Sequence, residues 1–155
     1  MKEIKLTQNK IALVDDDDFE ILNQYKWCAV RVSGGSYYAA RKQGKKKIYM
    51  HKELLKVPKN RVVDHIDGNT LNNCMANLRE CSIAENVRNQ KIRSTNTTGF
   101  KGVSYYKNRN MYAARIMLNY RAHFIGLYYT PEGAARAYNQ RAKELFGEYA
   151  LLNIV

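Results

Sequence analysis

The sequence has little that would tie it to a membrane, an export pathway or a structural zinc site. No apolar run approaches the roughly 20 residues that span a bilayer, and the N-terminal stretch MKEIKLTQNK lacks the apolar core of a secretory signal. The three cysteines, Cys28, Cys74 and Cys81, form no C-x-x-C pair, which predicts reduced thiols and no structural zinc. We therefore expect a soluble protein of the cytoplasm.

Positive charge is what the sequence has in excess. Among 155 residues, 26 Lys and Arg stand against 14 Asp and Glu, giving a formal net charge of +12. The charge is +6 over residues 1–60, +1 over residues 61–95 and +5 over residues 96–155. Basic surfaces bind the phosphates of nucleic acids and release counterions. Charge alone leaves open whether the partner is DNA or RNA, and whether the protein binds or also cuts.

The first 60 residues indicate short strands joined by turns. The acidic cluster Asp15–Asp18 predicts a helix cap and first-turn charge for a helix over residues 19–25, in preference to a metal site. Ser33-Gly34-Gly35-Ser36 predicts a hairpin turn, and a short helix is expected to end near Pro58.

The remaining residues predict two further units, so the fold class expected is α+β. Residues 61–92 have the pattern strand, loop, strand, helix, and the capping box Ser82-x-x-Glu85 starts the helix, which runs to about Lys91. A polar linker at 93–99 precedes a C-terminal unit over 100–155. That unit is expected to be a three-stranded antiparallel sheet plus one helix, beginning at Thr130-Pro131 and ending at Gly147.

A candidate site for phosphodiester hydrolysis lies in the central unit. Asp64 offers a hard oxygen ligand for a cation, and His65 is the one plausible base nearby. Asn86, about one turn into the helix, can offer an amide oxygen to the same cation, and Asn77 can hold the far nitrogen of His65. The competing interpretation is that an Asp-His pair is common by chance and that asparagines of the polar loop, Asn69, Asn72 and Asn73, only make turns. We expect His51 and His123 to be structural.

The run VVDHIDGNTLNN…NLRECSIAENVRNQ resembles the HNH nucleases, in particular the homing endonucleases with a ββα-metal fold. The resemblance implies that Asp64 and Asn86 are metal ligands, that His65 is the general base, and that Asn77 holds it. The chain is then an H-N-N variant with one divalent cation, Mg²⁺ or else Mn²⁺. An HNH nuclease domain would span residues 1–92, with a β-rich part at 1–60 and the ββα-metal motif at 61–92.

The C-terminal run FKGVSYY…MYAARIML…HFIGLYYTPEGAARAYNQRAKELFGEYALLN is similar to the DNA-binding domain of the plant ethylene-response factors, in which a sheet reads duplex DNA. Together the resemblances imply a homing enzyme that cuts double-stranded DNA inside a bacterial or phage-infected cell. A single active site per chain predicts that a monomer nicks one strand, whereas a double-strand break would need a dimer or sequential nicks. The expected DNA contacts come from both basic ends of the chain: Lys45, Lys46, Lys47, Lys101, Tyr106, Arg109, Arg115 and Arg121.

Two other functions remain open from the sequence. The chain could be a sequence-specific DNA-binding regulator whose nuclease unit is inactive, or a basic RNA-binding protein. An intact set of Asp64, His65, Asn77 and Asn86 argues against the first, and a preference for duplex DNA would argue against the second.

Overall fold

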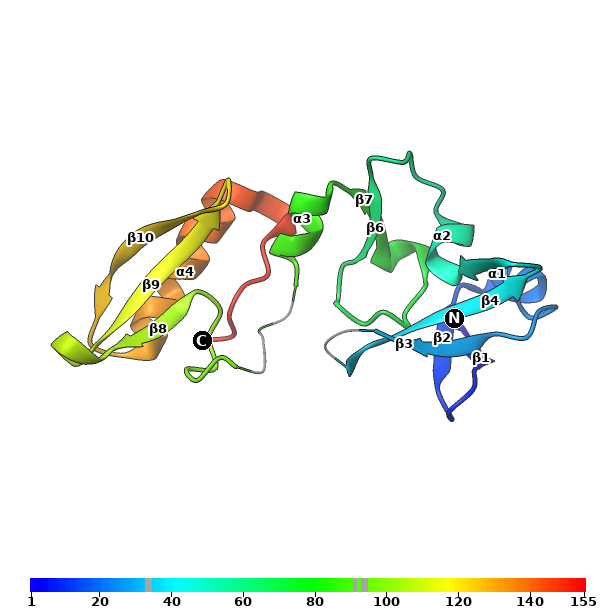
Figure 1. The fold of residues 1–155 in the computed structure, drawn as a ribbon, viewed down its shortest axis with the longest axis horizontal. Coiled ribbons are helices and arrows are strands. Elements are labelled where there is room, and N and C mark those ends of the chain that lie inside the picture. The colour runs from blue at the N-terminus through cyan, green and yellow to red at the C-terminus, as the bar shows by residue number, and fades with distance from the viewer. Residues whose placement is uncertain (33–34, 91, 93–94) are drawn as a thin grey trace. The chain divides into compact units, whose positions relative to one another are not determined.

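The computed structural model describes residues 1–32, 35–90, 92 and 95–155, which form two compact units, Met1–Val87 and Arg88–Val155 (Figure 1). Both contain helices and strands, so the predicted α+β class is confirmed. Three parts of the predicted elements lie outside the described residues: Ser33 and Gly34 of the hairpin turn, Lys91 at the helix end, and residues 93–94 of the linker. No helix in the described part of the chain has the length and apolarity that crossing a membrane requires.

The first unit begins with a two-stranded sheet and a short helix. Strand β1 (Lys2–Lys5) pairs antiparallel with β2 (Ile11–Val14), and α1 (Asp16–Leu22) follows at once. Helix α1 begins three residues earlier than predicted because Asp16, Asp17 and Asp18 form its first turn. The carboxylate of Asp15, at the N-cap, instead accepts a 2.7 Å hydrogen bond from the backbone N–H of Met75.

A three-stranded antiparallel sheet and a second short helix complete the packing of this half. The strands are β3 (Cys28–Arg31), β4 (Tyr37–Gln43) and β5 (Lys46–Tyr49), and helix α2 (Met50–Leu54) follows without a break. The apolar core joins both sheets and both helices through small and large side chains. It consists of Ile4, Leu6, Ala12, Val14, Leu22, Trp27, Ala29, Ala39 and Met50.

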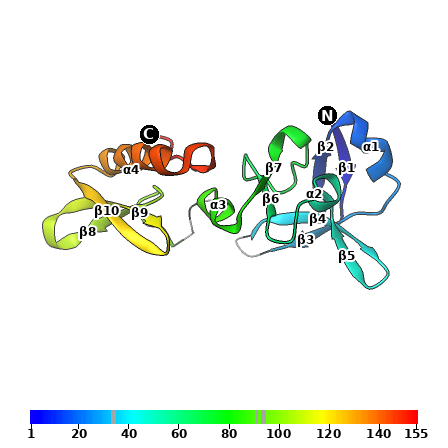
Figure 2. The same ribbon diagram turned by 90° about the horizontal axis from the view of Figure 1, so that it is seen from above.

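The central strands form an antiparallel pair that leads directly into a helix (Figure 2). They are β6 (Val62–His65) and β7 (Leu78–Cys81), joined by a loop that ends in a 3₁₀ turn, η2 (Met75–Asn77). Helix α3 (Ile83–Arg88) follows β7 after the single residue Ser82. The order strand, loop, strand, helix is the one the sequence predicts.

The second unit is one sheet covered by one helix. Its strands are β8 (Val103–Tyr106), β9 (Met111–Leu118) and β10 (Arg121–Tyr128), with β9 in the middle and the short turn η3 (Lys107–Arg109) between β8 and β9. Helix α4 (Pro131–Phe146) begins at its cap Thr130, whose hydroxyl accepts from the N–H of Gly133, and a last 3₁₀ turn, η4 (Gly147–Tyr149), follows it.

Helix α4 packs on the sheet through the apolar stripe that the sequence predicts: Ala134, Ala135, Tyr138, Ala142 and Phe146 are buried and Leu145 is half-buried. The contact is close enough to require a glycine. Gly102 has φ +74°, and a Cβ at this position would lie 2.2 Å from the ring of Tyr138. Small residues on both elements therefore let the helix lie directly against the strands.

Candidate active site

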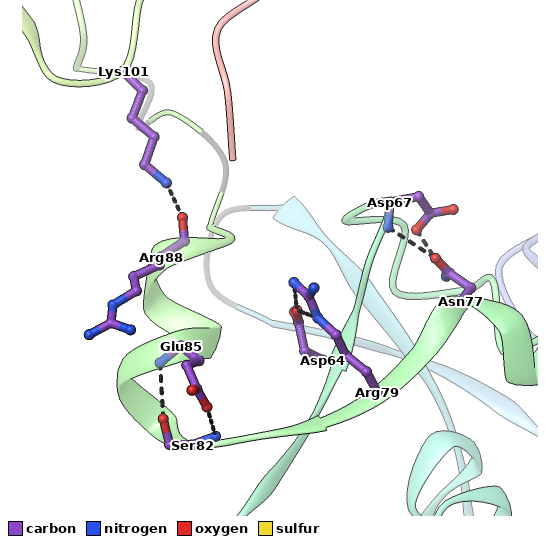
Figure 3. A network of polar contacts seen from close by, with 8 residues as sticks. All are labelled: Asp64, Asp67, Asn77, Arg79, Ser82, Glu85, Arg88 and Lys101. Carbon is purple, nitrogen blue, oxygen red and sulfur yellow. Dashed lines mark hydrogen bonds and ion pairs between the residues drawn. The ribbon is translucent and has the colours of Figure 1, made fainter. Parts of the chain in front are cut away.

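Asp64 and His65 lie side by side at the end of β6, and both are almost completely buried. Because successive residues of a strand point to opposite faces, the carboxylate and the imidazole have different surroundings. Asp64 is opposite Arg79 of β7. Nε and Nη2 of Arg79 donate to the same carboxylate oxygen, Oδ2 of Asp64, over 3.0 and 2.8 Å (Figure 3). The sequence gives no warning of this buried ion pair.

The imidazole of His65 contacts a buried amide side chain of the loop between β6 and β7. Its Nε2 is 3.4 Å from the amide oxygen Oδ1 of Asn73, which is fully buried. Burial lowers the pKa of His65, while the contact with Asn73 and the charges of Asp67 and Asp64 act in the opposite direction. His65 is therefore held in its neutral form, which is the form that can accept a proton from water.

Asn77 has partners other than the expected one. Its amide nitrogen donates to Asp67 Oδ1, and its amide oxygen accepts from the N–H of Asp67 (Figure 3). The amide nitrogen also donates to the backbone carbonyl of Asn72. Asn77 thus closes the loop between β6 and β7, and Asn73, which the sequence analysis assigned to a turn, occupies the place beside His65. Partial burial raises the pKa of Asp67, but hydrogen bonds from Asn72, Asn69 and Asn77 outweigh it and hold that pKa below its usual value.

His51 is the residue near the site that the sequence did not reveal. It lies in α2, is 5% exposed, and its ring centroid is 5.3 Å from that of His65 in an edge-to-face arrangement. Tyr38 and Tyr49 contact the same ring at centroid distances of 4.9 and 5.7 Å. Nδ1 of His51 is the one fully buried side-chain nitrogen or oxygen, within the described residues, that has no hydrogen-bond partner. A histidine of the short helix therefore forms one wall around the candidate base.

Acid is expected to destabilise the protein through His51. Burial, and then the charges of His65 and Lys52, lower the pKa of His51 to about 3, whereas its ordinary value is 6.5. Between these values the unfolded chain binds a proton that the folded chain does not. The free energy of unfolding should therefore fall by up to about 1.4 kcal/mol for each pH unit below the ordinary value.

Urea unfolding of wild type and His51→Phe between about pH 7 and pH 4.5 measures this slope. The wild type should lose more stability than the variant on acidification, and the variant should keep or gain stability at neutral pH because its ring has no unpaired nitrogen. Parallel pH dependences for the two proteins would contradict the assignment.

Asn86 lies in α3, whose start is fixed by the capping box that the sequence predicts. The N–H of Ser82 donates to Oε2 of Glu85 over 2.7 Å, and the N–H of Glu85 donates to the hydroxyl of Ser82 over 3.2 Å (Figure 3). These reciprocal bonds are confirmed. Asn86 follows Glu85, is half-buried, and bonds through its backbone N–H to Ser82.

The donors at this site suit a hard cation with few protein ligands. Asp64 supplies a carboxylate and Asn86 an amide oxygen, both of the kind that Mg²⁺ prefers in proteins. Within the described ranges, no three side chains of His, Cys, Asp or Glu lie together in a way that could hold a metal ion. Such a cation would therefore keep much of its water, and the carboxylate of Asp64 would be shared with Arg79.

Most of the expected DNA-binding residues are exposed. Lys45, Lys46 and Lys47 lie at the turn between β4 and β5. In the second unit the exposed residues are Tyr106, Arg109, Arg115 and Arg121. Arg115 also donates to the hydroxyl of Ser104 over 3.2 Å.

Lys101 has a different position from the one expected. Its ammonium group donates to the backbone carbonyl of Arg88, at the end of α3 (Figure 3). It also donates to the backbone carbonyl of Gln90, just beyond that end. Burial lowers the pKa of Lys101 to about 8. The last carbonyls of a helix have no partner within the helix, and a lysine is well suited to bind them. This contact engages the ammonium group of the half-buried Lys101 with the backbone.

We expect Lys101→Met to lower the free energy of unfolding by about 1–3 kcal/mol, because two carbonyls lose their donor. Its affinity for duplex DNA should change less than that of Arg115→Ala or Arg121→Ala. Thermal unfolding and fluorescence anisotropy on the three variants test both points. A stable Lys101→Met protein with the weakest DNA binding of the three would return Lys101 to the DNA-binding set.

Known proteins resemble this chain in the segment that holds the candidate active site. The family described as HNH endonuclease matches residues 56–88, which include β6, β7 and α3. An uncharacterized HNH endonuclease of Acanthamoeba polyphaga mimivirus is 36% identical over 146 residues, which cover 92% of this chain and 74% of that protein. Protein 3.8 of Escherichia phage T7 is 37% identical over 94 residues, covering 61% of this chain and 77% of that protein. No solved structure matches the chain.

Proposed function

Because this chain belongs to the HNH endonuclease family, we propose that it hydrolyses phosphodiester bonds of double-stranded DNA at the site formed by β6 and α3. One observation carries the proposal. A buried, neutral histidine adjoins a buried carboxylate at the end of β6, within the segment that the family matches. A histidine in this state is able to act as a base near neutral pH.

In the proposed mechanism His65 takes the proton of the attacking water. Asn73 holds the far nitrogen of the imidazole, and the ring of His51 limits its movement. Asn77 acts one step away, because it fixes the loop that carries Asn73.

Asp64 and Asn86 would hold a divalent cation, Mg²⁺ or Mn²⁺. A bound cation supplies charge stabilisation at the phosphate oxygens and at the departing 3′ oxygen. Arg79 fixes the Asp64 carboxylate within the β6–β7 pair through two hydrogen bonds to Oδ2.

The second unit supplies DNA affinity in this proposal, by analogy with the ethylene-response-factor domain. Support comes from its sheet-and-helix architecture and from a formal charge of +8 over residues 88–155. The lysines at the β4–β5 turn add a second basic surface. A role in homing or in another mobile element follows from the resemblance alone.

The test is conversion of supercoiled plasmid by the purified protein after removal of metals. We expect no cutting in EDTA and cutting when Mg²⁺ or Mn²⁺ is restored. A chain with a single site should release nicked circles before linear DNA, since a monomer cuts one strand at a time. Tight binding of the plasmid without cutting in either metal would favour the DNA-binding regulator instead. A preference for RNA in a competition assay would favour the RNA-binding protein.

A further inference from the structure

The face of the C-terminal sheet that α4 leaves uncovered is apolar. The pairing register places Arg115 opposite Phe124, and it places Met117 opposite Ala122. In an antiparallel sheet such partners lie on the same face. Ala114 and Ile116, on the alternate positions of β9, pack toward α4. Alternation then assigns the following residues to the uncovered face: Ser104, Tyr106, Met111, Ala113, Arg115, Met117, Ala122, Phe124 and Leu127.

Arg115 is the one charged side chain in this set, which we call the outer face. Phe124 is 60% exposed and Met117 is 59% exposed, so large apolar groups meet solvent on both sides of Arg115. A sheet that binds DNA by charge alone would carry several lysines or arginines here. The composition of the outer face calls for a ligand with apolar groups of its own.

Basic residues border the outer face at both ends of its strands. Lys107 and Arg109 lie in the turn between β8 and β9, and Arg121 follows the turn between β9 and β10. Figure 1 shows these two turns at opposite ends of the sheet. All three side chains are exposed. An apolar band between two positive ends is complementary to a groove whose floor has apolar groups and whose walls are phosphates.

We propose that the outer face reads thymine methyl groups in the major groove of duplex DNA. Thymine is the base that presents a methyl group in that groove, and small apolar and aromatic side chains are its usual partners. Phe124, Met117 and Ala122 contact the methyl groups, and Arg115 pairs with a guanine edge or a phosphate between them. This inference rests on the proposed function, because it needs the protein to bind duplex DNA.

The charge of the second unit argues against a second copy of the chain on the outer face. Residues 88–155 have a formal charge of +8, and two such faces in contact would bring like charges together. A polyanion neutralises the same charge. Duplex DNA therefore accounts for the apolar band and for the basic ends together.

The experiment compares two duplexes of identical A·T-rich sequence, one with thymine and one with deoxyuridine, which lacks only the methyl group. Binding of the full chain is measured by fluorescence anisotropy in EDTA, where no cleavage is expected. The wild type should bind the thymine duplex more tightly, by about fourfold for each methyl group contacted. The double variant Phe124→Ala/Met117→Ala should lose most of this preference, since of the three proposed methyl contacts only Ala122 is unchanged. Ile21→Ala is the matched control, because Ile21 is 62% exposed on α1, in the first unit; it should keep the preference.

Each other outcome overturns the inference in a distinguishable way. Equal binding of the two duplexes by the wild type removes the methyl reading and leaves the DNA-binding function intact. Failure to bind either duplex removes the proposed function as well. A dimer seen by sedimentation without DNA, and abolished in Phe124→Ala/Met117→Ala, would assign the outer face to a second copy.

Discussion

Replacing Arg79 by alanine is expected to lower the free energy of unfolding by about 3–5 kcal/mol. The guanidinium and the Asp64 carboxylate lie between paired strands, with side chains 11% and 6% exposed. Two of the donors of Arg79 converge on one carboxylate oxygen. Without the guanidinium, the buried carboxylate of Asp64 loses this ion-pair partner, and that loss costs free energy.

A neighbouring ion pair provides the control. Arg61 and Glu80 lie at the same strand pair, 3.0 Å apart, but their side chains are 33% and 43% exposed. Removing Arg61 should cost less than about 1 kcal/mol, since exposed pairs contribute little. Urea unfolding of Arg79→Ala, Arg61→Ala and wild type measures the difference. Equal losses for the two variants would contradict the buried ion pair.

The double variant Asp64→Asn/Arg79→Met separates lost charge from lost packing. Because it removes both charges together, it should recover a large part of the stability that Arg79→Ala loses. The double variant should not cleave DNA, because it lacks the Asp64 carboxylate that we propose as a cation ligand. Recovery of activity along with stability would show that Asp64 is not needed for a cation.

Local signals in the sequence were sufficient for the elements that carry the site. The bonds of the Ser82 and Glu85 capping box span three residues, and the apolar stripe of α4 repeats within one helix. The packing of Tyr138 on Gly102 joins distant residues, yet the helical period already places Tyr138 on the buried side. Patterns of this kind depend on neighbours along the chain, so a single sequence shows them.

The side chains that contact His65 could not be predicted, because these contacts join residues that are not neighbours in the sequence. Asn73 and Asn77 both lie in a loop rich in asparagine, and only the fold shows which amide lies beside His65 and which closes the loop. His51 comes close to His65 because α2 and β6 pack together around Tyr38. The residue types indicated what the side chains could do, but only the fold showed which of them are in contact.

Lys101 shows the same limit for a charged residue. In the sequence it is one lysine of a basic unit, and its neighbours Phe100 and Gly102 say nothing of α3. In the structure its ammonium group binds backbone carbonyls thirteen and eleven residues earlier in the chain. Counting basic residues therefore overestimates the surface available to DNA.

Replacing His65 by alanine should have the largest effect on activity. General-base catalysis by a positioned side chain contributes about 10²–10⁴-fold to a rate. His51 cannot substitute in place, because its ring is buried behind His65 and its pKa of about 3 makes it a weak base. Binding of DNA should persist, since the basic surfaces are unchanged.

The most direct measurement is therefore the single-turnover rate of cleavage of one labelled duplex in Mg²⁺ by wild type, His65→Ala and His123→Ala, with the affinity of each for the duplex measured in EDTA. His123 is the matched control because it is exposed on β10, in the other unit. The proposed mechanism predicts that His65→Ala binds like wild type but cuts at least about 100-fold more slowly, while His123→Ala cuts at the wild-type rate. Equal cutting by His65→Ala and wild type, or no cutting by wild type in Mg²⁺ or Mn²⁺, would contradict it.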